Sequence, residues 1–361
     1  MNKTRKITLF IMATVLAWGC GFGYAASEVS QTAVVYGADA NPTGEPLGGG
    51  VGYSKIILNG DYTVANKEQF LAALSAAKHG EVIYLEPEAE INLTGFISLE
   101  IPGGITIAGN RGYQGSPGPL IYTNQLDTYP YLLTILKQGV RITGIRLRGP
   151  SPYRPQSNGL NISADRTEID NCEVYNWSNS GIQVMRADDV YIHHNFIHNV
   201  RRPGLGYPVV LNRATALIEA NVFDYYRHAI AGTGYAGTGY EARYNLVKGN
   251  AISHAFDMHG GTDFCPRQAV PCTPQERIMA GSYLHIHHNT FLITSYQSIV
   301  IRGIPTENVD VHHNWFYNYP QDCVTYRNYS GGNVNVYENI YGDDKYYVEV
   351  LMTPGPIIKL P

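Results

Sequence analysis

Short segments of alternating apolar and polar residues recur along most of the chain, and helical spacing is rare. The clearest helical stretch is NKEQFLAALSAAKHG at 66–80, where Phe70 and Leu74 lie one turn apart and Asn66 stands at the N-cap position. The pattern predicts one helix there. Short strands are expected from about residue 81 to the end of the chain.

From about residue 140 the strand-like segments repeat with a period of roughly 25 residues. One line carries an asparagine at the same place in each copy, and Cys172 takes that place one copy earlier. The asparagines are Asn195, Asn221, Asn245, Asn289, Asn314 and Asn339. The one long step is explained by one repeat plus an inserted loop at 262–281. A second line, which includes AIAGT (229–233), AFDMH (255–259) and SIVIR (298–302), repeats as regularly.

A β-rich repeat of this length has too little core to fold alone, and stacking the repeats buries a continuous core. Asparagines stacked in one turn can each bond the rung above and the rung below, which satisfies the buried turn backbone. The sequence therefore predicts an all-β protein, a right-handed parallel β-helix. The helix at 66–79 is expected to cover the first rung and protect its open edge.

The ends of the chain are read from local composition. Positive residues, an apolar run at 7–17 and a small-residue cleavage candidate predict a signal peptide at 1–25, hence a secreted or periplasmic protein. Cys20 loosely resembles a lipoprotein site, so a lipid anchor at the outer surface is the alternative to a cysteine lost with the signal. Residues 26–54, rich in Gly, Ser and Pro, are expected to form an extended lead-in. Residues 55–361 are expected to form a single β-helix domain.

Composition narrows the classes of function. Hydrophobic residues make up 44% and charged residues 16%, which is typical of a globular chain. A net charge of -4 argues against nucleic acid as a partner, but an anionic sugar polymer could still bind a local row of arginines. In an exported protein, Cys265 and Cys272, which bracket a short loop, are predicted to form a disulfide. Cys172 and Cys323 are expected to be small buried side chains.

Candidate chemistry lies on the outward face of the second line. Side chains alternate in and out along a strand, so Asp257 and His259 point outward, with Arg302 one rung further on and Arg327 beyond it. A row of arginines along this edge would suit a string of carboxylates, because each guanidinium binds a carboxylate through two parallel hydrogen bonds. The alternative is a set of solvated arginines that stabilise turns. The row consists of Arg186, Arg201, Arg202, Arg213, Arg227, Arg302 and Arg327.

Histidines converge on the same two rungs. His228 and His254 begin successive strands and should stack one rung apart, whereas the histidines of the recurrent HHN segments are expected to be structural. The candidate catalytic residues are His259, Asp257, His254, His228, Arg302 and Arg243. The candidate substrate-binding residues are Arg227, Arg327, Arg213, Tyr240 and Tyr235.

This combination suits β-elimination from a polyuronate, which needs a neutralised carboxylate, a base for the C5 proton and an acid for the leaving oxygen. Arg302 and Arg243 would bind the carboxylate, His259 or His228 would be the base, and a tyrosine or second histidine the acid. Asp257 would hold a histidine tautomer. No metal or other cofactor is expected, because arginine and histidine can supply all three roles.

The asparagine ladder, the HHN segments and the N-terminal helix make residues 60–345 similar to the pectate-lyase-like β-helix superfamily. That superfamily includes polysaccharide lyases, hydrolases, uronan epimerases and adhesin modules. The string HAFDMH also resembles the Tyr-Gly-Phe-Asp-Pro-His signature of mannuronan C5-epimerases. Phe256, Asp257 and His259 match it, while His254 and Met258 stand in place of tyrosine and proline. The resemblance implies chemistry at C5 of a uronan.

The predicted function is that of an exported, metal-independent polysaccharide lyase that acts as a monomer on an anionic, uronate-containing polysaccharide. A uronan C5-epimerase shares the C5 carbanion and is the first alternative. A glycoside hydrolase would need two carboxylates on one face, of which only Asp257 is apparent. A non-catalytic glycan-binding or adhesin β-helix would not explain the concentration of histidine, aspartate and arginine in two rungs.

Overall fold

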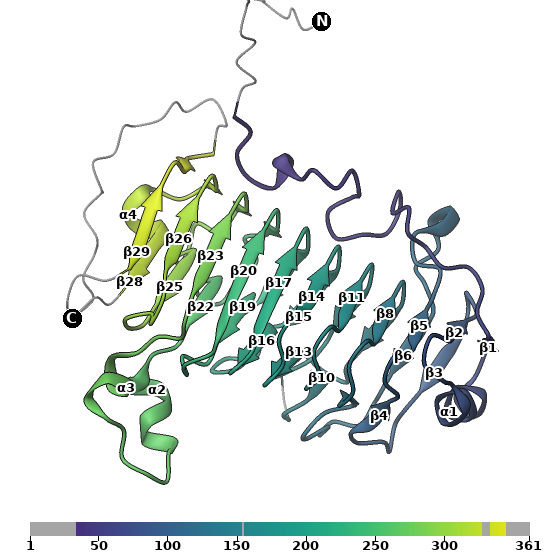
Figure 1. Ribbon diagram of the computed structural model, residues 1–361. Helices are drawn as coiled ribbons and strands as arrows, with labels where there is room; N and C mark the ends of the chain where they lie inside the picture. Colours follow the sequence, from purple (N-terminus) through teal and green to yellow (C-terminus); the bar gives the residue numbers. More distant parts are fainter. Residues whose placement is uncertain (1–33, 154, 327–332, 344–361) are drawn as a thin grey trace, which may run out of the picture. The chain divides into compact units, whose positions relative to one another are not determined.

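Strands of three parallel sheets alternate along the chain, and from β2 to β28 each turn of the chain adds one strand to each sheet (Figure 1). The computed structural model describes residues 34–153, 155–326 and 333–343. The predicted signal peptide, the first residues of the lead-in and the end of the predicted domain lie outside these residues. Every strand pairing between neighbouring rungs is parallel, for example Ile192 with Ile218. The predicted parallel β-helix is confirmed.

The elements have the following bounds. The eleven-stranded sheet contains β1 (Tyr62–Val64), β2 (Val82–Leu85), β5 (Thr106–Ala108), β8 (Arg141–Thr143), β11 (Glu168–Asp170), β14 (Val190–His193), β17 (Thr215–Glu219), β20 (Gly239–Arg243), β23 (Leu284–His287), β26 (Val309–His312) and β29 (Val334–Tyr337). The ten-stranded sheet contains β3 (Glu90–Asn92), β6 (Leu120–Tyr122), β9 (Arg146–Arg148), β12 (Glu173–Tyr175), β15 (Phe196–Val200), β18 (Val222–Tyr226), β21 (Leu246–Val247), β24 (Thr290–Phe291), β27 (Trp315–Phe316) and β30 (Ile340–Tyr341). The nine-stranded sheet contains β4 (Leu99–Ile101), β7 (Leu133–Ile135), β10 (Asn158–Ile162), β13 (Ser180–Met185), β16 (Tyr207–Asn212), β19 (Ile230–Gly232), β22 (Phe256–Met258), β25 (Ile299–Ile301) and β28 (Val324–Tyr326). The helices are α1 (Lys67–Ala76), α2 (Gly261–Phe264), α3 (Pro274–Ile278) and α4 (Pro320–Cys323), with short 3-10 turns η1 (Ala38–Ala40), η2 (Tyr113–Gly115) and η3 (Cys265–Arg267).

The predicted asparagine ladder is present and continuous. The Oδ1 atom of Asn221 accepts from the backbone and the side chain of Asn195, both at 3.0 Å, and its Nδ2 donates to Ile192 O at 2.9 Å. The long step across the insertion is also bridged, because Asn245 N donates to Asn289 Oδ1 at 3.0 Å. The ladder closes one corner of the β-helix with its backbone groups satisfied.

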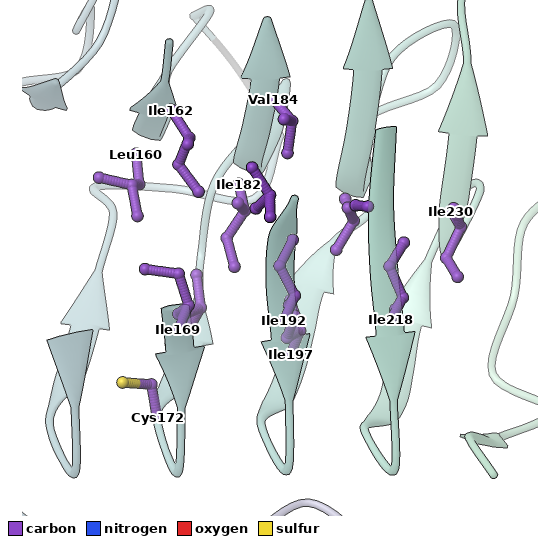
Figure 2. Close-up of a cluster of buried hydrophobic side chains, with 14 of the residues drawn as sticks. Leu160, Ile162, Ile169, Cys172, Ile182, Val184, Ile192, Ile197, Ile218 and Ile230 are labelled. Carbon is purple, nitrogen blue, oxygen red and sulfur yellow. The ribbon is translucent and has the colours of Figure 1, made fainter. Parts of the chain in front are cut away.

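Inward side chains of the three sheets fill one continuous core (Figure 2). Ile169, Ile192 and Ile218 occupy the same position on successive rungs, and Leu160 faces them from the nine-stranded sheet. Cys172 is a buried, unpaired member of this core, and Cys323 is likewise buried and unpaired. Stacking of identical positions is what allows rungs of about 25 residues to share one core.

Helix α1 contributes side chains to the N-terminal end of the β-helix core. The Asn66 side chain accepts a hydrogen bond from Gln69 N at 3.0 Å, which confirms the predicted N-cap. Phe70 is fully buried and Leu74 is nearly so. Both belong to the same core as the buried residues of β1, β2 and β3. None of the helices among the described residues is long and apolar enough to cross a membrane.

Residues 35–53 of the predicted lead-in pack against several rungs of the β-helix. Gly37 N donates to His313 O at 3.0 Å, near one end. Tyr53 Oη donates to the buried carboxylate of Asp170 at 2.8 Å, several rungs away (Figure 1). The segment therefore runs across the rungs in the reverse order of the chain.

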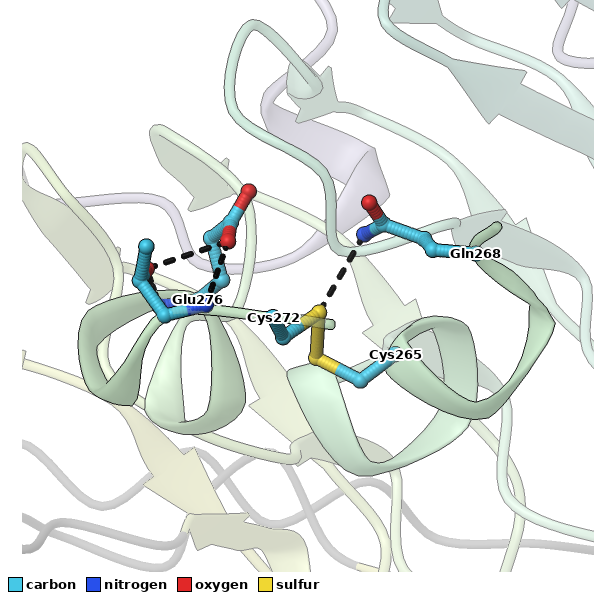
Figure 3. The surroundings of a disulfide bond; sticks show 5 residues. Cys265, Gln268, Cys272 and Glu276 are labelled. Carbon is cyan, nitrogen blue, oxygen red and sulfur yellow. Dashed lines mark hydrogen bonds between the residues drawn. A yellow bond between two sulfur atoms is a disulfide. The ribbon is translucent and has the colours of Figure 1, made fainter. Parts of the chain in front are cut away.

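The insertion after β22 carries α2, η3 and α3, and the predicted Cys265–Cys272 disulfide closes it (Figure 3). Gln268 Nε2 donates to Cys272 Sγ at 3.3 Å. Glu276 forms a capping box with Thr273 at the start of α3. These contacts give the insertion a defined shape beside the nine-stranded sheet.

Candidate active site

Asp257, the central residue of β22, organises a cluster on the outward face of the nine-stranded sheet. It is 0% exposed because three cationic or polar side chains cover it. Arg302 donates from Nε to Oδ1 at 3.0 Å and from Nη2 to Oδ2 at 2.9 Å. His259 Nε2 lies 2.9 Å from Oδ2 and His254 Nε2 lies 3.1 Å from Oδ1. Burial alone would raise the pKa of Asp257, but the contacts with His259 and His254 hold that pKa well below its usual value.

His259 lies between two carboxylates. Its Nε2 faces Asp257, and its Nδ1 lies 3.0 Å from Oδ2 of Asp263, a residue of α2. Burial lowers the pKa of His259, but these two carboxylates outweigh burial and raise the pKa above its usual value. A histidine that donates from both nitrogens is an imidazolium and has no lone pair to accept a proton. The two carboxylates favour the protonated form of His259, so this arrangement suits a role as an acid better than the predicted role as a base.

His228 and His254 stack one rung apart as predicted, with ring centroids 3.9 Å apart. His228 is 0% exposed and its Nδ1 donates to the carbonyl oxygen of His254 at 2.8 Å. Burial lowers the pKa of His228 to about 2, with the neighbouring His254 acting in the same direction. Because His228 is fully buried, it cannot contact a substrate in this structure, which therefore does not support its predicted role as a base.

A cation already occupies the position where a metal ion would bind. Ligand atoms of His228, His254 and Asp257 all lie within 4.8 Å of one another. The guanidinium of Arg302 grips both oxygens of Asp257 and comes within 3.4 Å of His254 Nε2. A metal ion bound by these three residues would have to displace Arg302, so the residues fit a metal poorly.

A cavity of about 530 Å³ opens beside this cluster. It extends from Gln183 on β13 to Arg302 just after β25, four rung spacings or about 19 Å. Its lining includes Asn179, Gln183, Tyr207, Asn212, Arg227, Thr233, Tyr235, His259, Asp263, Phe264, Arg267 and Arg302. At the edge of the cavity Gly234 has a φ of +82°, and a Cβ there would lie 2.0 Å from the His259 carbonyl oxygen, so this close approach requires glycine.

Three arginines at the cavity have no acidic partner among the residues that the structure describes. Arg227 donates from Nη1 to Tyr207 Oη at 3.1 Å, and Arg213 lies 3.7 Å from the ring centroid of Tyr235. Arg267, which η3 contributes, is exposed at the mouth. The cavity therefore carries positive charge that the protein itself does not neutralise, which favours an anionic ligand.

Two predicted site residues lie elsewhere. Arg243 is on the eleven-stranded sheet, where it pairs with Glu219 and, at 2.7 Å, with Glu241, so it cannot share a carboxylate with Arg302. Tyr240 is fully buried and packs against Phe256 in the core. Both predictions are wrong: Arg243 lies around a corner of the rung from the nine-stranded sheet, and Tyr240 points into the core.

The other predicted residues divide into three groups. Arg227 and Tyr235 line the cavity. Arg213 does not line it but stacks its guanidinium on the ring of Tyr235. Arg327 lies outside the described residues. The sequence analysis does not predict Tyr207 or Asp263 as site residues. For Tyr207, its position at the start of an outward-facing strand was a usable signal.

Comparison with known proteins addresses the fold. Residues 135–343, more than half of the chain, match a family described as "Right handed beta helix region". The chain belongs to this right-handed β-helix family. The match confirms the predicted family and the predicted hand of the solenoid. No curated protein matches the chain significantly in sequence.

Two solved structures resemble this β-helix. One is an alginate lyase from Paenibacillus sp. str. FPU-7, with 13% identity, a TM-score of 0.51, and coverage of 78% of this chain and 94% of that one. The other is the catalytic unit of a thermostable GH87 α-1,3-glucanase from Streptomyces thermodiastaticus strain HF3-3, with 12% identity, a TM-score of 0.41, and coverage of 74% and 54%. At these identities the likeness concerns the fold alone.

Proposed function

We propose that this β-helix protein is a polysaccharide lyase that cleaves a uronate-containing polymer by β-elimination. The observation that carries the proposal is a histidine held between two carboxylates, His259, beside arginines that have no acidic partner among the described residues, all in one elongated cavity. The similar solved structure that is an alginate lyase supports it only by its fold. The signal-like segment at 1–25 and the disulfide favour action outside the cytoplasm.

Binding of the substrate carboxylate is assigned to Arg227 together with Arg302. Arg227 uses one nitrogen on Tyr207 and has no carboxylate partner among the described residues, so its other donors can bind the substrate. Arg302 already holds Asp257 and adds positive charge at the same end of the cavity. A guanidinium that binds the carboxylate also stabilises the charge that develops when the C5 proton leaves.

The proton transfers are assigned to Tyr207 and His259. Tyr207 must first lose its phenol proton to solvent. As the phenolate it takes the C5 proton, the C–H electron pair becomes the C4–C5 double bond, and the C4–O bond breaks with its electron pair leaving on the oxygen. His259 gives a proton to that oxygen. Burial raises the pKa of Tyr207 above its usual value, and Arg227 opposes this shift by stabilising the phenolate. The assignment replaces a histidine base with a tyrosine base and keeps Asp257 as the group that orients histidines.

Glycoside hydrolysis is less consistent with this geometry. It requires a protonated carboxylic acid and a second carboxylate that can approach the sugar. Asp257 is fully buried, and its depressed pKa keeps it ionised. A C5-epimerase remains the second candidate, because the Phe256-Asp257-x-His259 match falls in the cavity cluster and the C5 carbanion is common to both reactions.

The test is incubation with alginate, glucuronan, polygalacturonate and glycosaminoglycans, with and without chelator, while the ultraviolet absorbance of the unsaturated uronate is followed. We expect product on at least one polymer in the presence of chelator. His259→Gln should reduce the rate about a hundredfold or more, whereas the matched control His285→Gln, on the eleven-stranded sheet, should not. Deuterium at C5 without unsaturated product would identify an epimerase. Neither signal on any polymer would exclude both.

A further inference from the structure

The insertion supplies a side chain to the catalytic cluster. Asp263 Oδ2 lies 3.0 Å from His259 Nδ1 and 3.3 Å from Arg302 Nη1, so one oxygen joins two residues of the cavity. The Asp263 side chain is 33% exposed and lines the cavity. It belongs to no rung of the β-helix, because it follows β22 in the inserted segment.

The protein contains its own comparison for the effect of this contact. His254 and His259 both point Nε2 at Asp257, at 3.1 and 2.9 Å. The second nitrogen of His254 faces only the Ser253 hydroxyl, at 3.4 Å, whereas that of His259 faces the Asp263 carboxylate. Burial lowers the pKa of His254 despite Asp257, while the two carboxylates raise the pKa of His259 despite burial. Asp263 is the second carboxylate that His259 has and His254 lacks, whereas His254 instead has Arg302 Nη2 at 3.4 Å and the stacked ring of His228.

The insertion holds Asp263 in place through contacts on both sides. Gly261 N donates to Met279 O at 2.8 Å, which joins the two ends of the insertion. Phe264, the next residue, stacks on Tyr235 with ring centroids 4.2 Å apart. The disulfide begins one residue later, at Cys265. The carboxylate therefore sits between an anchored loop end and a cross-linked turn.

We propose that Asp263 is a positioning residue that keeps both nitrogens of His259 protonated, and that the Cys265–Cys272 disulfide holds Asp263 where it can do so. The effect on rate rests on the proposed function, in which His259 is the acid. The protonation of His259 can be measured without any substrate. Closure of the disulfide after export would then complete the site.

The first experiment is an NMR titration of the His259 ring in the intact protein, with the signal assigned by its loss in His259→Gln. In Asp263→Asn we expect the midpoint to fall by about one pH unit or more, the effect of removing a charge at this distance. Asp263→Glu should restore part of the shift. The matched control Asp322→Asn, on the short helix α4, should leave it unchanged. An unaltered midpoint in Asp263→Asn would overturn the proposal.

The second experiment tests the disulfide and the link to catalysis. Cys265→Ser/Cys272→Ser, and mild reduction of the folded wild-type protein, should each move the His259 midpoint in the same direction as Asp263→Asn. If neither does, the role given to the disulfide is wrong. On an active polymer, the alkaline limb of kcat/KM should move by the same amount as the midpoint. A moved midpoint with an unmoved limb would show that His259 is not the acid, which refutes the link to rate but not the proton-holding role of Asp263.

Discussion

Replacing Asp257 by asparagine should destabilise the protein strongly, and the structure fixes the reason. Both oxygens of Asp257 accept hydrogen bonds, but an asparagine amide has only one acceptor oxygen. Its NH2 group must therefore point at donor groups of Arg302 and a histidine. If the nitrogen replaces Oδ2, the contacts from Arg302 Nη2 and His259 Nε2 are lost. If it replaces Oδ1, the contacts from Arg302 Nε and His254 Nε2 are lost. Either orientation removes two charge-assisted hydrogen bonds.

Each such bond contributes about 1.5–3 kcal/mol, so the free energy of unfolding should fall by about 3–6 kcal/mol. This agrees with the cost of about 3–5 kcal/mol for breaking a buried ion pair, here by leaving Arg302 without its partner. The measurement is urea denaturation at neutral pH, followed by circular dichroism, with an unchanged denaturant slope as the check that the comparison is valid. The partly exposed Asp263→Asn is the control, with an expected loss of about 1 kcal/mol or less. A loss below about 1 kcal/mol for Asp257→Asn would refute the reasoning.

Three further predictions concern the scaffold and the cavity. Asn245→Ala removes the acceptor of Asn221 N and the donor to Ile218 O, both buried, and should cost about 2–5 kcal/mol in urea denaturation. An effect within the error of the assay would contradict the ladder's role. Burial, followed by the adjacent His193, lowers the pKa of His194 to about 4. Between about pH 6.5 and pH 4, His194 therefore binds fewer protons in the folded protein than in the unfolded chain. Stability should fall by about 3 kcal/mol as the pH drops through that window, and His194→Asn, measured at both limits, should flatten the dependence. Arg227→Lys should raise KM about tenfold on an active polymer because the paired hydrogen bonds are lost, whereas Arg243→Lys should leave KM unchanged. Equal KM values for these two variants would remove Arg227 from the binding site.

The fold could be predicted from the sequence because the same structural requirement recurs in each rung. Each asparagine of the ladder must accept from the rung before it, and this requirement leaves a visible period that survives even the insertion between Asn245 and Asn289. Alternation then places side chains correctly within one sheet. Counting along the nine-stranded sheet brought Asp257, His259 and Arg302 together, as the structure has them.

Alternation fails where the chain changes direction. Arg243 shares a rung with Arg227 and His228, which predicts that it lies near Arg302, but it points outward from a different sheet. The same alternation makes Tyr240 inward, as the structure shows. Tyr207 begins β16 and Arg227 directly follows β18, both beside a corner, where period-two counting gives no direction for a side chain.

The part of the site that no repeat could reveal is also the part that sets its chemistry. Asp263 lies in the insertion, where neither the period nor the alternation assigns a position, and only the three-dimensional path of α2 brings it to His259. Without Asp263, one nitrogen of His259 would lose its carboxylate, as in His254, whose second nitrogen faces the Ser253 hydroxyl. With Asp263, both nitrogens of His259 face a carboxylate, which suits the acid role that we propose. The β-helix thus fixes which residues of the rungs meet in the cavity, while the inserted loop, which carries the disulfide, supplies the carboxylate on which the proposed acid role of His259 rests.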